Sequence, residues 1–171
     1  NEQSMRVDAL KEQLSKQQTK IERMMNFWIG GVIERFVDAL VSITAGSFRM
    51  GSVQNDEQSY PSEHPAQPVT LPNDFLMGKF PVTQVLWRRV MGNNPSRFKG
   101  EHRPVESVSW FDAVTFCNQL SELEGLESMY TIDGNHVVCQ WNKKGYRIPT
   151  EAEWEYCARA KESCTYSGSD I

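Results

Sequence analysis

Residues 145–160 constrain the fold more than any other stretch of the sequence, and they read GYRIPTEAEWEYCARA. Pro149 fixes its own φ and keeps Ile148 away from helical backbone geometry. Thr150 is then a typical helix N-cap, because Glu153 follows three residues later and completes a T-x-x-E capping box. The segment therefore predicts a turn, a short extended stretch and a helix that starts after Thr150.

The acidic residues of this helix allow a second interpretation, as acid–base catalysts or metal ligands. Helix capping and the helix dipole already account for Glu151 and Glu153, so we interpret both as structural. Asp133-Gly134-Asn135 lacks the spaced acidic ligands of a calcium loop and is typical of a turn. The histidines are separated by long stretches: His64, His102 and His136. We therefore assign no residue as catalytic, cofactor-binding or metal-ligating.

Residues 1–40 differ in character from the rest and predict an amphipathic helix. Large apolar residues occupy the a and d positions of a heptad, with Gln17 as the polar exception, and form an apolar seam: Val7, Leu10, Leu14, Ile21, Met24 and Trp28. So narrow a stripe is typical of a coiled coil, whereas a helix packed on its own domain usually has a wider one. A homo-oligomer or a partner helix bound through residues 5–28 fits this pattern, and a helix folded back on its own domain remains the alternative.

Residues 41–171 predict an α+β domain in which short strands alternate with turns and helices. Two helices are expected, at residues 83–92 and 109–125, because each segment begins with a capping hydroxyl and ends with a glycine. Apolar side chains recur at helical spacing between these ends. The two segments therefore supply the main helical faces of a core.

The strands of this domain are indicated by β-branched and aromatic residues between turn signals. We expect two strands near residues 41–50, separated by a turn at Ala45-Gly46. A hairpin is expected over residues 130–141, because Asp133-Gly134 stands between two apolar runs and favours a type I′ turn. Short strands of this kind suit a domain with little regular structure.

Composition excludes several classes of partner. The chain has 171 residues and a net charge of -4 at pH 7, which gives no electrostatic footprint for nucleic acid. No apolar run reaches the length of a transmembrane helix. The four cysteines lack a C-x-x-C motif, which favours free thiols and a cytoplasmic setting: Cys117, Cys139, Cys157 and Cys164. No signal peptide is visible, but the sequence begins at Asn1 and a targeting segment can have been removed, so the compartment stays open.

Several segments, taken in order, resemble the formylglycine-generating enzymes, a family also called sulfatase-modifying factors. Residues 45–52 (AGSFRMGS) are similar to the opening P-A-G-x-F-x-M-G-S of that family, and Thr44 replaces the usual proline. Three later segments of this chain resemble the next blocks of the family: GKFPVTQ, VMGNNPS and PVESVSW, which end at Gln84, Ser96 and Trp110. Residues 145–156 (GYRIPTEAEWEY) resemble a further block. We assign to this structural signature Gly51, Trp110, Gly145, Arg147, Pro149, Thr150, Glu151, Glu153 and Trp154.

The resemblance implies an irregular C-type-lectin-like fold. Members of the family oxidise a sulfatase cysteine to formylglycine with copper held by two active-site cysteines, whereas relatives of the same fold use iron or only bind ligands. The family segments that carry those cysteines and most calcium ligands have no counterpart here, so the sequence resembles the N-terminal part only. We expect no cofactor for this chain, and calcium or copper only together with the missing C-terminal half.

Three hypotheses about function follow. The first is a non-catalytic binding or scaffold module that assembles through its N-terminal helix. The alternative is the N-terminal half of a formylglycine-generating or related thiol-oxidising enzyme, whose catalytic half is missing or supplied by another chain. A structural relic of a broken gene is the third. Fold alone does not assign chemistry, and a cysteine-bearing block beyond Ile171 would favour the enzyme.

We predict that the chain self-associates, or binds a partner helix, through the apolar seam. Each large apolar side chain removed from water contributes about 1.5–3 kcal/mol, so the seam has to be covered by its own domain or by a second helix. Light scattering on the full chain and on a version that starts at Val41 distinguishes the two. Two monomers, with a much lower melting temperature for the shortened version, would contradict assembly.

Overall fold

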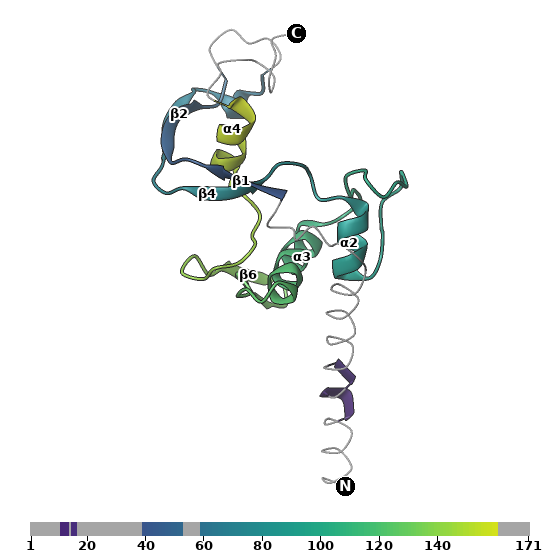
Figure 1. Ribbon diagram of the computed structural model, residues 1–171. Coiled ribbons are helices and arrows are strands. Elements are labelled where there is room, and N and C mark those ends of the chain that lie inside the picture. Colours follow the sequence, from purple (N-terminus) through teal and green to yellow (C-terminus); the bar gives the residue numbers. More distant parts are fainter. Residues whose placement is uncertain (1–10, 14, 17–38, 53–58, 161–171) are drawn as a thin grey trace. The chain divides into compact units, whose positions relative to one another are not determined.

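The computed structural model describes residues 11–13, 15–16, 39–52 and 59–160, and the chain divides into two compact units. Figure 1 shows the helices and strands of both units. Among the described residues, the first unit contains the helical stretches 11–13 and 15–16 together with residues 80–147. The second unit contains residues 39–52, 59–79 and 148–160. No helix in this described part has the length and apolar character that a membrane span requires.

The second unit is built on a long two-stranded antiparallel ribbon. Strand β1 pairs with β4, and β2 pairs with β3, so the two pairs follow each other along one ribbon. A short 3₁₀ helix, η2 (Pro61–Glu63), precedes β3. The four strands are β1 (Leu40–Ile43), β2 (Gly46–Met50), β3 (Gln67–Leu71) and β4 (Phe75–Gly78).

The ribbon bends between its two strand pairs, at the position where the sequence predicts a turn. Ile43 lies opposite Phe75 and Gly46 lies opposite Leu71, so the second side has one more intervening residue than the first. An extra residue of this kind bends a ribbon. The Asp74 carboxylate accepts the N–H of Ala45 at 2.7 Å and fixes the bend. The predicted turn at Ala45-Gly46 is therefore wrong, because the chain continues along the same ribbon.

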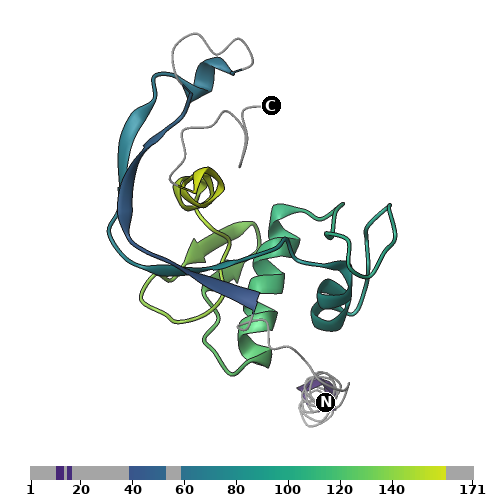
Figure 2. The same cartoon turned by 45° about the horizontal axis from the view of Figure 1, so that its top comes forward.

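Helix α4 (Glu151–Arg159) packs against β2 and β3, and Figure 2 shows the ribbon curving around it. The Tyr156 side chain is 9% exposed, and its ring meets the edge of Phe48 with centroids 5.4 Å apart. Its hydroxyl donates to the carbonyl of Thr44 at 3.2 Å. A Cβ atom at Gly46 would lie 2.5 Å from that hydroxyl oxygen, so this close approach requires glycine.

Two further side chains of α4 bind both polar groups of one glycine at the end of β2. Gly51 has φ of +96°, a backbone conformation that favours glycine. Its N–H donates to the Glu155 carboxylate at 2.9 Å, and its carbonyl accepts from the Arg159 guanidinium at 2.8 Å. Arg159 also pairs with Glu155 at 2.7 Å. Helix α4 therefore holds the backbone at Gly51 through both of its polar groups.

The first unit packs two helices against each other and against a hairpin. The Trp87 indole on α2 stacks on the Phe116 ring of α3, with centroids 5.0 Å apart and an interplanar angle of 5°. The elements are α2 (Gln84–Met91), α3 (Trp110–Leu123), β5 (Tyr130–Asp133) and β6 (His136–Cys139). Their buried apolar core contains Trp87, Val90, Val114, Phe116, Leu120, Leu123 and Met129. The predicted α+β class is confirmed.

The predicted helix ends are confirmed at α2 and close to the prediction at α3. Thr83 caps α2, and Gly92 ends it in the left-handed conformation with φ of 79°. Ser109 and Asp112 form a capping box at the start of α3. At the other end Glu124 is the cap, and Gly125, with φ of +74°, follows it rather than being the cap itself.

The hairpin of β5 and β6 differs from prediction at its turn. Asp133 lies opposite His136, so Gly134 and Asn135 are the central residues. Among the described residues, Gly134 has a positive φ of 56° and Asn135 does not. A type I′ turn needs a positive φ at both central residues, whereas a type II′ turn needs it at the first only. The type I′ prediction is therefore wrong, and β6 ends at Cys139 rather than near Trp141.

The residues Gly145-Tyr146-Arg147 belong to the first unit and close it. A Cβ atom at Gly145 would lie 2.0 Å from the carbonyl oxygen of Glu127, so no other residue fits there without movement. The Tyr146 N–H donates to the buried Ser121 hydroxyl at 2.8 Å. The Arg147 guanidinium lies 4.7 Å from the centroid of the exposed Trp141 ring. This part of the signature is therefore structural as well.

The predicted N-terminal helix lies almost entirely outside the described residues. Lys11–Gln13 and Ser15–Lys16 are helical, and Glu12 pairs with Lys16 at 2.8 Å on an exposed face. The pKa of Glu12 is lowered, because Lys16 donates a hydrogen bond to it and attracts its charge. The apolar seam itself and Cys164 lie outside the described residues. Assembly through the seam stays a prediction.

We predict that Thr150→Ala destabilises the second unit. The Thr150 hydroxyl accepts the Glu153 N–H at 3.2 Å, and the Glu153 carboxylate accepts the Thr150 N–H at 2.8 Å, so the predicted capping box is confirmed. Losing such a cap typically costs about 1 kcal/mol. Thermal melts of the variant should show a lower midpoint, whereas Thr150→Ser keeps the hydroxyl and serves as the control. An unchanged midpoint for Thr150→Ala would mean that the cap contributes nothing.

Candidate functional site

The described residues do not present a metal or copper centre of the kind the resemblance implies. They contain no group of three His, Cys, Asp or Glu side chains placed to hold a metal ion. Copper held by two cysteines needs both sulfurs as thiolates. Burial raises the pKa of the Cys117 thiol to about 12, and burial also raises that of Cys157, which belongs to the other unit. Burial therefore favours the protonated form of these two thiols, and the third described cysteine, Cys139, is half-buried in the same unit as Cys117.

The three histidines divide between the two units. His64 belongs to the second unit, where it is half-buried and its ring lies 2.6 Å from the Ser59 hydroxyl. His102 and His136 belong to the first unit and are exposed. None of the three belongs to a metal-holding group of described side chains.

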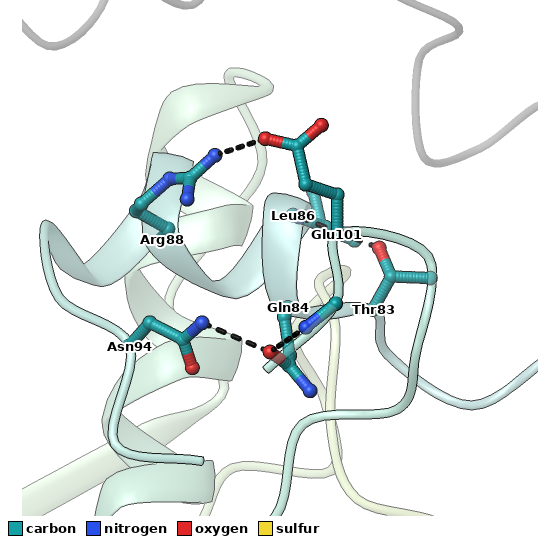
Figure 3. Close-up of polar contacts among 7 residues, drawn as sticks. Thr83, Gln84, Leu86, Arg88, Asn94 and Glu101 are labelled. Atoms are coloured by element: carbon teal, nitrogen blue, oxygen red, sulfur yellow. Dashed lines mark hydrogen bonds and ion pairs between the residues drawn. The ribbon is translucent and has the colours of Figure 1, made fainter. Parts of the chain in front are cut away.

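The most organised polar feature of the first unit is the α2–α3 loop, residues 92–109, which is shown in Figure 3. Its centre is Gln84, whose side chain is 1% exposed although it stands in the first turn of α2. A carboxamide has two N–H donors and an oxygen that accepts two hydrogen bonds. A buried Gln must satisfy these groups inside the protein, because leaving one unpaired is costly.

The loop supplies every partner that the Gln84 carboxamide needs. The nitrogen donates to the carbonyls of Phe98 at 2.9 Å and of Pro104 at 3.1 Å. The oxygen accepts from the Asn94 amide at 2.9 Å and from the Gly100 N–H at 3.1 Å. One side chain of α2 therefore holds four points of the loop in place.

A second set of contacts holds the same loop next to its junction with α3. Ser96 is only 1% exposed, and its hydroxyl accepts a hydrogen bond from the N–H of Glu106 at 3.1 Å. The Glu106 carboxylate accepts the N–H of Phe98 at 2.8 Å. Hydrogen bonds from the Ser107 hydroxyl and from the Phe98 N–H lower the pKa of Glu106, which therefore stays ionised and turned towards the loop backbone. The loop is rigid because its interior is polar and paired.

An ion pair joins the outer side of the loop to α2. The Arg88 guanidinium lies 2.8 Å from the Glu101 carboxylate, and this contact lowers the pKa of Glu101. Both side chains are largely exposed, so the pair adds little stability. The pair matters for the local charge, because Arg88 neutralises Glu101. The remaining Arg and Lys side chains then give the loop a positive net charge.

The outer surface of the loop carries an aromatic ring and several cations. The Phe98 side chain is 62% exposed, and the Arg97 guanidinium lies 5.5 Å from the centroid of its ring. The exposed cations of the loop are Arg97, Lys99 and Arg103. Residues 84–109 contain five Arg or Lys against two Glu, a net charge of +3, while the whole chain has -4. This loop is therefore a local positive region on an acidic chain.

The signature residues are divided between the two units. Gly51, Glu153 and Gly145 make the structural contacts described above, in two different units. Trp110 and Trp154 are instead exposed, at 52% and 60%. Trp110 meets Phe111 edge-on, with ring centroids 5.3 Å apart, near the start of α3.

Sequence reasoning missed the importance of Gln84 and Ser96. Both lie in segments that carry the family resemblance, but neither was singled out as a site residue. The available signal was a Gln directly after a capping Thr83 in a short helix, followed by Asn94-Pro95-Ser96 in the next loop. Buried polar side chains close to turn residues commonly hold loop backbone in place.

Comparison with known proteins agrees with this architecture. Residues 32–171 match the family model described as the sulfatase-modifying factor enzyme 1-like domain. The chain is 41% identical over 151 residues to the chaperone protein LppX of Paenibacillus barcinonensis, covering 78% of this chain and 50% of that one. It is 34% identical over 79 residues to the formylglycine-generating enzyme of Mus musculus, covering 46% of this chain and 15% of that one. The chain therefore spans half or less of these relatives.

Solved structures show the same fold. Treponema denticola variable protein 1 has a TM-score of 0.65 and 35% identity, over 77% of this chain and 56% of that one. CarF has a TM-score of 0.62 and 25% identity, over 77% and 63% of the two chains. PvdO from Pseudomonas aeruginosa has a TM-score of 0.54 and 25% identity, over 71% and 47%.

The family match covers far more than half of the sequence, and it includes both described units except for the stretch before residue 32. Its extent agrees with the ordered blocks of resemblance in the sequence and with the mixed helix and strand structure. The chain belongs to the family of sulfatase-modifying factor enzyme 1-like domains.

Proposed function

We propose that this chain is a non-catalytic binding module whose ligand is another polypeptide. The observation that carries the proposal is the α2–α3 loop, which is rigid inside and exposes Phe98 and three cations outside. A rigid surface loses little conformational entropy on binding. Arginine and aromatic side chains are also the residue types that most often dominate binding energy.

The relatives support a binding function by their names. One is called a chaperone, a class of protein that acts on other polypeptides, and another is called a variable protein. Because the chain spans only about half of each, the proposal concerns this portion alone. Assembly through the predicted N-terminal helix would place several copies of the loop together and raise its apparent affinity.

A thiol-oxidising enzyme is the alternative, because the mouse relative is a formylglycine-generating enzyme. The chemistry of the described cysteines speaks against it for this chain. A thiolate is the reactive and metal-binding form of cysteine, and burial of Cys117 favours the protonated form instead. None of the described side chains forms a metal-holding group that would offset this.

We predict that the chain does not convert cysteine to formylglycine. It is incubated with copper and a sulfatase-type cysteine peptide, and mass spectrometry follows the mass loss of the product. The expected result equals the copper-only control, because the family segments that carry the two copper-binding cysteines have no counterpart in this sequence. A formylglycine-generating enzyme in parallel shows that the assay works. Turnover above the copper-only control would establish the enzyme alternative.

We also predict that the chain binds peptides. An array of immobilised peptides that vary in charge and hydrophobicity is probed with the full chain, and binding is confirmed in solution by fluorescence anisotropy. Binding should be retained when Cys117 is replaced by Ala in a variant that still folds, because the thiol has no part in it. A chain that binds none of the peptides would contradict the proposed function.

A further inference from the structure

The outward side chains of the α2–α3 loop are concentrated in a small region, because their backbone converges on one group. The Phe98 carbonyl, the Gly100 N–H and the Pro104 carbonyl all bond to the Gln84 carboxamide. Backbone atoms that share one amide partner lie within a few ångströms of each other. Residues 97–103 are therefore folded into a tight projection over Gln84, which we call the basic knob.

The cations of the basic knob are held rather than freely extended. The Lys99 ammonium donates to the carbonyl of Asn94 at 2.8 Å. The Arg103 side chain packs on Gly100, where an added Cβ atom would lie 2.8 Å from its Cδ atom. The Arg97 guanidinium lies by the Phe98 ring. A partner therefore meets charges whose positions are already restricted, which reduces the entropy lost on binding.

The charge of the knob contrasts with that of the chain. Residues 97–103 contain three Arg or Lys and one Glu, and that Glu101 is paired with Arg88 from outside the knob. The chain as a whole carries -4. The knob is therefore positive on a chain that is negative overall, so an acidic ligand is attracted to this region, and the charge pattern favours binding there.

We propose that the basic knob binds an acidic segment of the partner polypeptide, with the exposed Phe98 ring as its apolar contact. This inference rests on the proposed function and names the chemistry of its ligand. Three cations within seven residues suit a short segment that carries several Asp or Glu side chains. A long polyanion such as nucleic acid depends on many neutralised phosphates, and the knob offers three cations only.

The test uses the full chain and two labelled peptides. One peptide places Asp and Glu around a central Phe, and the other replaces each acid by Asn or Gln. The knob variant combines Arg97→Gln, Lys99→Gln and Arg103→Gln. The matched control combines Lys11→Gln, Lys16→Gln and Lys144→Gln, which removes the same number of positive charges from exposed positions elsewhere. Melting temperatures verify that both variants fold, and fluorescence anisotropy gives each Kd.

The acidic peptide should bind the unchanged chain, and the knob variant should bind it about tenfold more weakly, whereas the matched control stays within about twofold. The neutral peptide should bind weakly to all three proteins. Salt should weaken the acidic complex of the unchanged chain more than that of the knob variant, since screening is strong at about 1 M ionic strength. Phe98→Ala should also weaken binding but leave the salt dependence unchanged, which keeps the test usable if the triple variant does not fold.

Different failures have different meanings. Equal binding of the acidic and neutral peptides, or equal losses in the knob and control variants, would overturn the acidic-segment inference while peptide binding itself stands. Binding of single-stranded DNA or phosphatidylserine vesicles as tightly as the acidic peptide would overturn the choice of a polypeptide. Binding of no peptide of any chemistry, here and on the array, would remove the proposed function and the inference with it.

Discussion

The α2–α3 loop depends on the burial of one carboxamide. Gln84 is almost fully enclosed, and its four hydrogen bonds go to Asn94, Phe98, Gly100 and Pro104 of a loop that has no strand or helix of its own. A buried polar group left without a partner costs about 1–3 kcal/mol, so the loop and the side chain enforce each other's position. The positions of the exposed side chains of the loop follow from these hydrogen bonds between its backbone and Gln84.

Other side chains also form hydrogen bonds with backbone N–H and C=O groups that lack a strand or helix partner. The Asn118 amide donates to the Tyr130 carbonyl at 2.7 Å, and its oxygen accepts the Tyr130 N–H at 2.9 Å, as a neighbouring strand would. Glu155 and Arg159 bind both polar groups of Gly51. Backbone groups that leave water have to be paired, and because the strands of the described residues pair only two by two, the side chains supply many of the partners. This explains how so little regular structure gives a defined fold.

The residues that hold this fold together are distinct from residues that would carry out a reaction. The amides, carboxylates and glycines described above have structural partners, and such a fold does not by itself assign a chemical function. Cys117 is buried in the core, where it packs as a small apolar side chain. Burial raises the pKa of its thiol to about 12. What the scaffold leaves free is its surface, and in the basic knob a paired polar interior, positive charge and an exposed ring coincide.

The sequence by itself determined the local elements. The capping box at Thr150, the N-caps Thr83 and Ser109 and the terminating Gly92 were all predictable, because each depends on residues within one helical turn. Tertiary structure decided what depends on distant partners. The bend at Ala45 requires Asp74, and the glycine at position 51 requires α4, more than a hundred residues later in the chain. The role of Gln84 likewise appeared only in three dimensions, because a buried carboxamide and a surface one have the same sequence pattern and differ only in which backbone groups surround them.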